Sequence, residues 1–219
     1  MKANPTSRWV VIVLILLTIS RQLMAQDRNG STPGPFDFTP IVSYGGGMNL
    51  AMQPVIPGKN PRLVVNASPS YGFAFGARIR EGDLIEVRWS RQDSYAEIRD
   101  ASLAFPRTPI TVNQLHCDFS HEYVIQHPAH WVRPFIIATV GATNMSAGEN
   151  PGSTYLSAGI GGGVKLLVSR RVGFRFQALW LSTLIDPHGN AVCGSGCQLH
   201  FAGTLGSQAE LTLGPVFRF

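Results

Sequence analysis

Four polar side chains that could take part in hydrolysis lie at alternate positions of one short segment: His116, Asp118, Ser120 and Glu122. A histidine base, a carboxylate and a serine hydroxyl are the groups that form an activated nucleophile. In a strand, however, alternate residues lie about 6.6 to 6.8 Å apart, whereas a nucleophile and its base must approach to about 2.6 to 3.2 Å. We therefore predict a network of hydrogen bonds and ion pairs here and no catalytic residue, since a triad would need partners from neighbouring strands.

A second group of reactive side chains lies near the C-terminus and contains His188, Cys193, Cys197 and His200. Their spacing matches no standard zinc motif. Cys193 and Cys197 are separated by Gly-Ser-Gly and can close a local disulfide if the chain reaches an oxidising compartment. We predict this disulfide, with Cys117 left unpaired, and we predict neither a metal nor a cofactor.

The N-terminal segment indicates export. Lys2 and Arg8 precede a run of about 12 apolar residues, and a small residue, Ala25, comes directly before Gln26. This run is too short for a membrane-spanning helix, which needs about 20 residues. We predict a signal peptide at 1–25 and a short linker at 26–35. Removal of residues 1–25 lowers the formal net charge from +5 to +2, so the basic pI does not indicate a nucleic-acid partner.

The mature chain has the composition of one β-rich domain. It is too apolar for a disordered chain, with 44% hydrophobic and 14% charged residues in the full sequence. The full sequence contains 23 glycines and 15 prolines, which suit many short strands joined by turns.

Apolar and polar residues alternate with a period of two in eight segments. One parity of the clearest segment carries Phe174, Phe176 and Trp180, and the other carries Arg175 and Gln177. The segments are 36–48, 71–80, 84–91, 114–124, 132–143, 155–168, 172–182 and 210–219. The fifth segment is ambiguous because Phe135 and Ile137 share the parity of Arg133. Short connections at 81–82, 126–131 and 169–171 alternate with long ones at 50–62, 93–109, 145–154 and 185–208, which predicts hairpins with both chain ends on one side.

These segments predict an all-β fold, an eight-stranded antiparallel up-and-down transmembrane β-barrel over residues 36–219. No apolar stretch after Gln26 reaches the ~18 residues of a membrane helix, and strands cross a bilayer only as a closed barrel. A soluble sandwich or lipocalin would share the alternation but would bury the apolar face. Eight strands enclose a narrow lumen filled by side chains. The polar parity predicts a charge network there, made of Arg78, Glu86, Arg88, Asp118, Glu122, Lys165, Arg175, Glu210 and Arg218.

Six aromatic residues are expected in girdles at the two membrane interfaces, where their rings lie between lipid and water. They are Tyr71, Trp89, Tyr123, Trp131, Tyr155 and Trp180.

The last eight residues, Thr212 to Phe219, resemble the C-terminal signal read by the barrel-assembly machinery, with matches at Thr212, Gly214, Phe217 and Phe219. Residues 36–46, Arg133-Pro134-Phe135 and the glycine-rich 158–164 are similar to strands of the outer-membrane β-barrel family of the OmpA and OmpX type. This resemblance implies a monomer in the outer membrane of a Gram-negative bacterium, in contact with lipids including lipopolysaccharide. No periplasmic domain is expected, because nothing follows Phe219.

We expect a structural or surface-interaction role without enzymatic activity. The 185–208 connection is the best candidate for contacts outside the cell. One alternative is a channel for small solutes or hydrophobic ligands, although the inward side chains leave little open space. The other is a lipid A deacylase or palmitoyltransferase, but His121 has no serine and acid beside it in a recognisable pattern.

Overall fold

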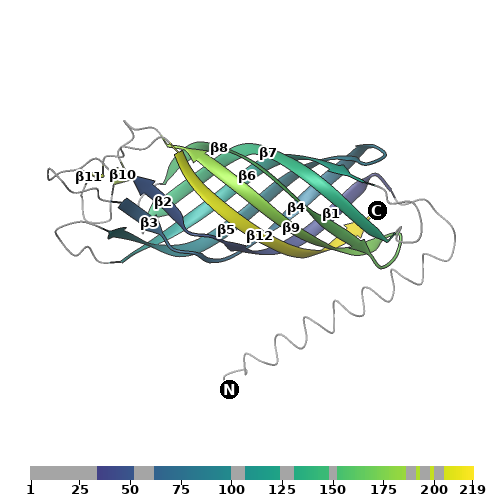
Figure 1. Cartoon of the computed structure of the whole chain (residues 1–219), viewed down its shortest axis with the longest axis horizontal. Coiled ribbons are helices and arrows are strands. Elements are labelled where there is room, and N and C mark those ends of the chain that lie inside the picture. The colour runs from purple at the N-terminus through teal and green to yellow at the C-terminus, as the bar shows by residue number, and fades with distance from the viewer. Residues whose placement is uncertain are drawn as a thin grey trace, which may run out of the picture.

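A computed structural model describes residues 34–51, 62–99, 107–123, 131–147, 152–185, 191–192, 198–199 and 205–219. The predicted signal peptide and nearly all of the predicted linker lie outside these residues. The described chain is built from strands (Figure 1), namely β1 (Phe36–Gly45), β2 (Met48–Ala51), β3 (Arg62–Val65), β4 (Ser68–Arg80), β5 (Asp83–Arg99), β6 (Thr108–Glu122), β7 (Val132–Ala147), β8 (Ser153–Leu167), β9 (Val172–Leu184), β10 (Ala191–Val192), β11 (Gln198–Leu199) and β12 (Leu205–Arg218).

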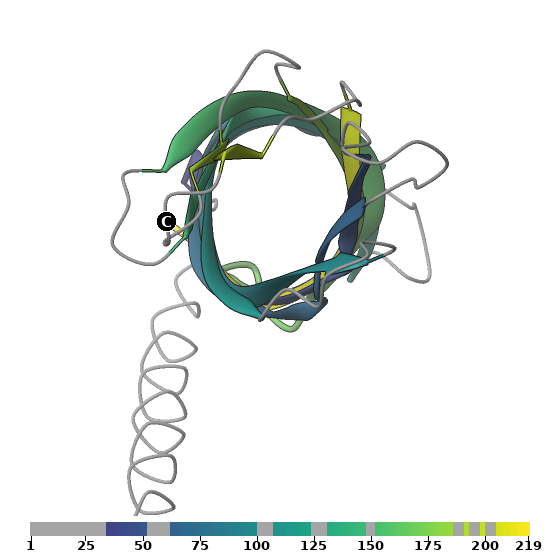
Figure 2. The same ribbon diagram turned by 90° about the vertical axis from the view of Figure 1, so that its left-hand side faces the viewer.

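Eight long strands close into a barrel. Each of β1, β4, β5, β6, β7, β8, β9 and β12 pairs with its neighbours in antiparallel fashion, and β12 returns to β1 with Arg218 opposite Asp37. Viewed from one end, the ribbon is a continuous ring (Figure 2). Such closure leaves no unpaired edge, and it confirms the predicted eight-stranded up-and-down barrel. Each predicted segment overlaps one of these eight strands, although several bounds differ.

The described residues include no helix long and apolar enough to span a membrane.

The barrel has two different ends. At the turn end, Gly82 turns the chain between β4 and β5 with a φ of 90°, a conformation that favours glycine. The Ser169–Arg171 turn lies at the same end, and Arg218 N donates to Arg171 O there at 2.7 Å. Strand β1 begins and β12 ends at this end, where Phe36 and Phe219 exchange backbone hydrogen bonds of 3.1 and 3.0 Å. The opposite end, called the loop end, holds the long connections. This arrangement agrees with the predicted alternation of short and long links.

From the turn end up to the level of Arg91 on β5, side chains have an inside-out arrangement. Along β9, Phe174, Phe176 and Trp180 are exposed, whereas Arg175 and Gln177 are buried. Val172 departs from the predicted parity and is buried. The ambiguous strand β7 is resolved, because Phe135 and Ile137 point inward and Ile136 and Val140 outward. Apolar side chains outside and ionised ones inside suit a barrel surrounded by lipid.

This arrangement reverses toward the loop end. The outward row of β5 carries Ile85, Val87 and Trp89, and from Arg91 onward it is charged at every position except Tyr95. Inside the barrel at the loop end, buried apolar residues form an inner collar, made of Met48, Val65, Ala96, Ile110 and Ile185. The barrel beyond Arg91, called the loop-end extension, therefore has the polar surface and apolar interior of a protein in water.

The reversal corrects the predicted strand lengths. Strand β5 continues eight positions beyond Arg91, to Arg99, and β6 begins at Thr108, so most of the predicted 93–109 connection is paired β-structure. The predicted 50–62 connection is likewise shortened by β2 and β3, which extend the first hairpin. The sequence rule that placed apolar residues outward could not recognise strands whose apolar residues face inward.

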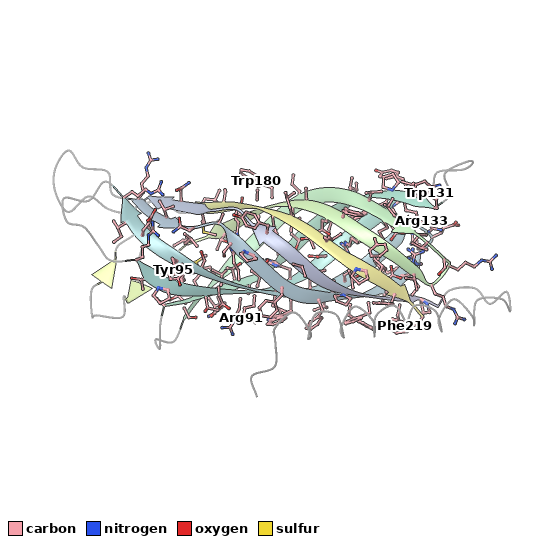
Figure 3. All side chains as sticks on the ribbon, turned by 90° about the horizontal axis from the view of Figure 1, so that it is seen from below. Arg91, Tyr95, Trp131, Arg133, Trp180 and Phe219 are labelled. Atoms are coloured by element: carbon pink, nitrogen blue, oxygen red, sulfur yellow. The ribbon has the colours of Figure 1, made fainter. Side chains whose placement is uncertain are left out.

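Five of the six residues predicted for the aromatic girdles lie at the outer surface. Tyr71, Tyr123, Trp131 and Trp180 are each about half exposed, and Trp89 is partly exposed beside Tyr71. In Figure 3, Trp131 lies at the turn end with Phe219, and Tyr95 lies toward the loop end. Tyr155 is the exception. It shares the inward parity of Ser157 and packs against the inner collar, so its assignment to a girdle is wrong.

Candidate functional site

The nine charged residues assigned to the lumen come from strands all around the barrel. Eight of them are at most 5% exposed, and the side chain of Arg78 is 19% exposed. Because strands place alternate residues on one face, closure of the barrel directs one parity of every strand to the same axis. The structure places the nine in two groups of ion pairs.

The first group, the basal cluster, lies near the turn end and is made of Asp37, Arg78, Glu122, Lys165 and Arg218. Lys165 Nζ lies 2.6 Å from Glu122 Oε1 and 3.2 Å from Asp37 Oδ2. Arg78 lies 3.2 Å from Asp37 and 3.3 Å from Glu122. Arg218 contacts the same two carboxylates at 3.4 and 3.5 Å. Each carboxylate is thus shared by cations from at least three different strands.

The second group, the central cluster, contains Glu86, Arg88, Asp118, Arg175 and Glu210. Arg175 Nη1 lies 2.7 and 2.8 Å from the two carboxylate oxygens of Glu86. Arg88 Nε donates to Asp118 at 2.9 Å, and its Nη1 lies 3.6 Å from Glu210. Burial of an ion is costly unless a counter-ion and hydrogen bonds compensate it. These pairs provide that compensation.

Two charged members of the lumen were absent from the prediction. Asp37 is 1% exposed and bridges three cations, and Arg133 lies 3.7 Å from Glu122. Asp37 alternates with Phe36 and Phe38, which is the signal that could have identified it. Arg133 shares its parity with Phe135 and Ile137, so the polar-inside rule gave no clear assignment for it.

An apolar layer occupies one side of the lumen and consists of Phe135, Ile137, Leu179 and Leu181. It lies against the inward glycines of β8. A Cβ on Gly161 would meet Leu179 Cδ1 at 3.0 Å, and one on Gly163 would meet Phe135 Cζ at 2.7 Å. The Arg175 guanidinium lies 4.9 Å from the centroid of the Phe135 ring, within cation–π distance. The glycines thus make room for apolar side chains that fill the bore.

Hydrogen bonds cross the bore at several levels. Strands β5 and β9 are separated by three strands on either side, so the Glu86–Arg175 pair spans the full width of the barrel. The Arg218–Glu122 pair joins β12 and β6, which are also opposite each other. Nearer the loop end, Gln208 Nε2 donates to Gln92 Oε1 at 2.8 Å. The inner collar lies beyond this level, so side chains cross or fill the lumen from the basal cluster to the loop end.

The structure brings a serine from another strand to His116, but the two side chains do not have the geometry of a nucleophile and its base. His116 Nε2 lies 2.7 Å from Ser157 Oγ on β8. The other ring nitrogen, Nδ1, lies 3.4 Å from Arg88 Nη2 and must accept, because a guanidinium only donates. The imidazole proton is then on Nε2 and is donated to Ser157, which also accepts from Thr143. His116 is therefore a donor to this serine and not its base.

His121 lies on the outward parity of β6, close to the turn end. Its Nδ1 is 2.7 Å from Asp83 Oδ1, and its ring packs edge-on against Tyr123 at 4.9 Å. The structure thus supplies the acid that the sequence pattern did not place beside His121. None of its described contacts is with a serine, threonine or cysteine.

The remaining predicted site residues are those of the C-terminal assembly signal and the cysteines. Thr212 and Gly214 point inward on β12, whereas Phe217 is partly exposed and Phe219 is exposed at the turn end. Cys117 is a free, exposed thiol on the apolar face. Cys193, Cys197, His188 and His200 lie outside the described residues. Among the residues that are described, no group of three or more His, Cys, Asp and Glu side chains could hold a metal ion.

No protein-family model matches the sequence, and no curated protein matches it either. Solved structures do match the fold. The crystal structure of neisserial surface protein A superposes with a TM-score of 0.56 at 14% sequence identity, covering 83% of this chain and 97% of that protein. The outer-membrane protein OprG of Pseudomonas aeruginosa gives a TM-score of 0.56 at 9% identity, covering 87% of this chain and 98% of OprG. The chain therefore has the eight-stranded fold of outer-membrane β-barrel proteins.

Proposed function

We propose that this protein is a monomeric outer-membrane barrel with a closed lumen, and that its role is structural and interactive at the cell surface. The turn end would face the periplasm and the loop end the exterior, as in barrels with short inner turns and long outer loops. The apolar outer surface between the turn end and Arg91, called the apolar band, would anchor the barrel in lipid. The loop-end extension would carry the long connections above the membrane.

The observation that carries this proposal is the series of bonds across the bore. Glu86 and Arg175 join opposite strands, and the basal cluster ties five strands together around Asp37 and Glu122. To open a path for solutes, these pairs would have to separate inside a narrow tube, and each separated charge would lose its counter-ion. A closed plug of this kind supports an anchoring role over a conducting one.

The lipid A-modifying alternative receives less support. Such an enzyme needs a nucleophile activated by a base where an acyl ester can reach it. His116 and Ser157 lie inside the barrel, with the histidine as the donor. His121 and Asp83 lie on the outer face at the turn end, which in the proposed orientation is the end away from the leaflet that contains lipid A.

Planar-bilayer recording of the purified full-length mature protein tests the closed lumen. We expect no steady conductance steps in the wild type. A stable open channel in wild-type protein would contradict the proposal and favour the solute-channel alternative. Mass spectrometry of lipid A from cells with and without the protein tests the enzyme alternative, and we expect identical spectra.

Biogenesis is part of the proposal. We expect cleavage of residues 1–25 on export, recognition of the Thr212–Phe219 segment by the barrel-assembly machinery, and a disulfide between Cys193 and Cys197. N-terminal sequencing and the mass of the mature protein with and without reductant check the first and the last of these expectations.

A further inference from the structure

Three arginines gather on the outer surface of the loop-end extension: Arg62, Arg99 and Arg107. Arg62 on β3 lies directly opposite Arg99 on β5 in the antiparallel register. Both face outward, because Val65 and Ala96, which point into the inner collar, belong to the other parity. Like charges directly opposite each other across two strands destabilise a sheet.

The described residues supply only one carboxylate to this group. Glu97 contacts Arg99 through a short hydrogen bond and lies 3.4 Å from Arg107 Nε. Arg62 makes no ion pair with any described residue. The side chains of Arg99 and Arg107 are 62% and 74% exposed. The cluster of Arg62, Arg99 and Arg107, called the arginine patch, therefore carries a formal charge of +3 against one described acid.

The distance of the arginine patch from the end of the apolar outer surface indicates which class of partner it can reach. Arg91 marks the end of the apolar row on β5, and Arg99 lies eight positions further along the strand. At about 3.3 Å per residue and a strand tilt of about 40°, the patch stands roughly 20 Å above the edge of the apolar band. In lipopolysaccharide, the phosphates of lipid A would lie near the level of Arg91. The core saccharide, which extends outward from lipid A, would reach the level of the patch.

We infer that the arginine patch binds the phosphate groups of the core saccharide of surrounding lipopolysaccharide. Guanidinium groups bind phosphate with two parallel hydrogen bonds. A phosphate between Arg62 and Arg99 would turn their repulsion into a shared attraction and would fix the loop-end extension in the saccharide layer. This inference rests on the proposed outer-membrane location and names the surface partner of the barrel.

A matched pair of double variants tests the inference in the full-length mature protein. Arg62→Gln with Arg99→Gln removes two charges from the patch, and Arg80→Gln with Arg170→Gln removes two exposed arginines from the turn end. Binding to three immobilised probes is measured: lipopolysaccharide with a phosphorylated core, the same material with its core dephosphorylated, and lipid A alone. We expect the patch variant to lose about tenfold or more in affinity for the phosphorylated core, and the turn-end variant to bind like the wild type. Equal binding of the first two probes by the wild type, or equal losses in both variants, would overturn the inference.

Three further measurements keep the test decisive. Heparin serves as a soluble sulfated competitor, and a patch variant that loses heparin binding but keeps its affinity for the phosphorylated core would also overturn the inference. In micelles without lipopolysaccharide, the patch variant should unfold at the same or a higher urea concentration than the wild type, because a repulsion is removed. Bilayer recordings of the patch variant should stay silent, so a failed binding test would leave the closed-barrel proposal standing.

Discussion

Arg175 and Glu86 join opposite walls of the barrel, with one guanidinium nitrogen within 2.8 Å of both carboxylate oxygens. Both side chains are almost completely buried, and Arg175 is also held by Gln177 and by the face of Phe135. The pair therefore acts as a strut across the lumen. Its geometry allows the contribution of the lumen network to be measured with single substitutions.

Arg175→Met should destabilise the barrel by about 3 to 5 kcal/mol, because it leaves Glu86 charged and unpaired in the lumen. Urea unfolding in lipid vesicles measures this change. The double variant Glu86→Gln with Arg175→Met should recover a large part of the loss, since no lone charge remains. Additive losses in the double variant would show that the two residues are not coupled.

The reversal of the side-chain pattern predicts that an introduced arginine has very different costs in stability at two outward positions of β5. Val87→Arg lies in the apolar band and should cost about 2 to 4 kcal/mol in a bilayer. Tyr95→Arg lies in the loop-end extension, 56% exposed, and should change stability by less than about 0.5 kcal/mol. Equal costs at the two positions would place the membrane boundary elsewhere.

Gly163 should tolerate no side chain. A Cβ there would lie 2.1 Å from the Phe176 carbonyl oxygen and 2.7 Å from Phe135 Cζ. Because backbone cannot move aside easily, Gly163→Val should lower the free energy of unfolding by about 3 kcal/mol or prevent folding, at the upper end of overpacking effects. Ala158→Val, on the exposed face of the same strand, is the control and should fold normally. Heat-modifiable migration on gels distinguishes folded from unfolded barrels for both variants.

Cys117 reports on the lipid-facing surface. It is exposed and lies between Leu115 and Phe119 on the apolar face of β6. In a Cys193→Ser, Cys197→Ser background, a charged maleimide should label Cys117 in detergent-unfolded protein but not in vesicles. A cysteine introduced by Asp93→Cys, in the charged outward row, should be labelled in both. Rapid labelling of Cys117 in vesicles would contradict the lipid-facing assignment.

Phe219 should matter for assembly in cells more than for the folded barrel. Its backbone bonds to Phe36 do not depend on the side chain, and its ring makes only peripheral contacts with Phe36 and Phe75. Phe219→Ala should therefore reduce the amount of barrel in the membrane while refolding in vitro with stability close to the wild type. A comparable loss in both settings would assign the residue a structural role alone.

The sequence predicted the fold well because one physical rule governs most of the chain. In the apolar band, a side chain faces either lipid or lumen, so Phe174 and Arg175 can be assigned from polarity alone. The rule fails where its premise fails. Beyond Arg91 the outward row of β5 is mainly polar and apolar residues such as Ala96 and Ile110 face inward, so polarity alone predicts a loop where β5 continues.

The lumen network was predictable as a set of residues but not as a set of partners. Parity places Glu86 and Arg175 inside, yet their pairing depends on the order and stagger of strands that are 89 positions apart in sequence. Asp37 was not among the predicted lumen residues, although the alternation with Phe36 and Phe38 indicates that its side chain points inward. Arg133 was obscured because Phe135 and Ile137 fill the same side of the lumen, a packing solution that the glycines of β8 permit.

Strand β5 continues from the apolar outer surface into the loop-end extension, so its outward positions are under two different physical constraints. Outward positions near Val87 accept only apolar residues, whereas outward positions near Tyr95 accept polar residues that are compatible with a β-strand. Substitutions on the outer sides of the loop-end extension can therefore change the polar surface of this end without altering the apolar outward residues of the same hairpin.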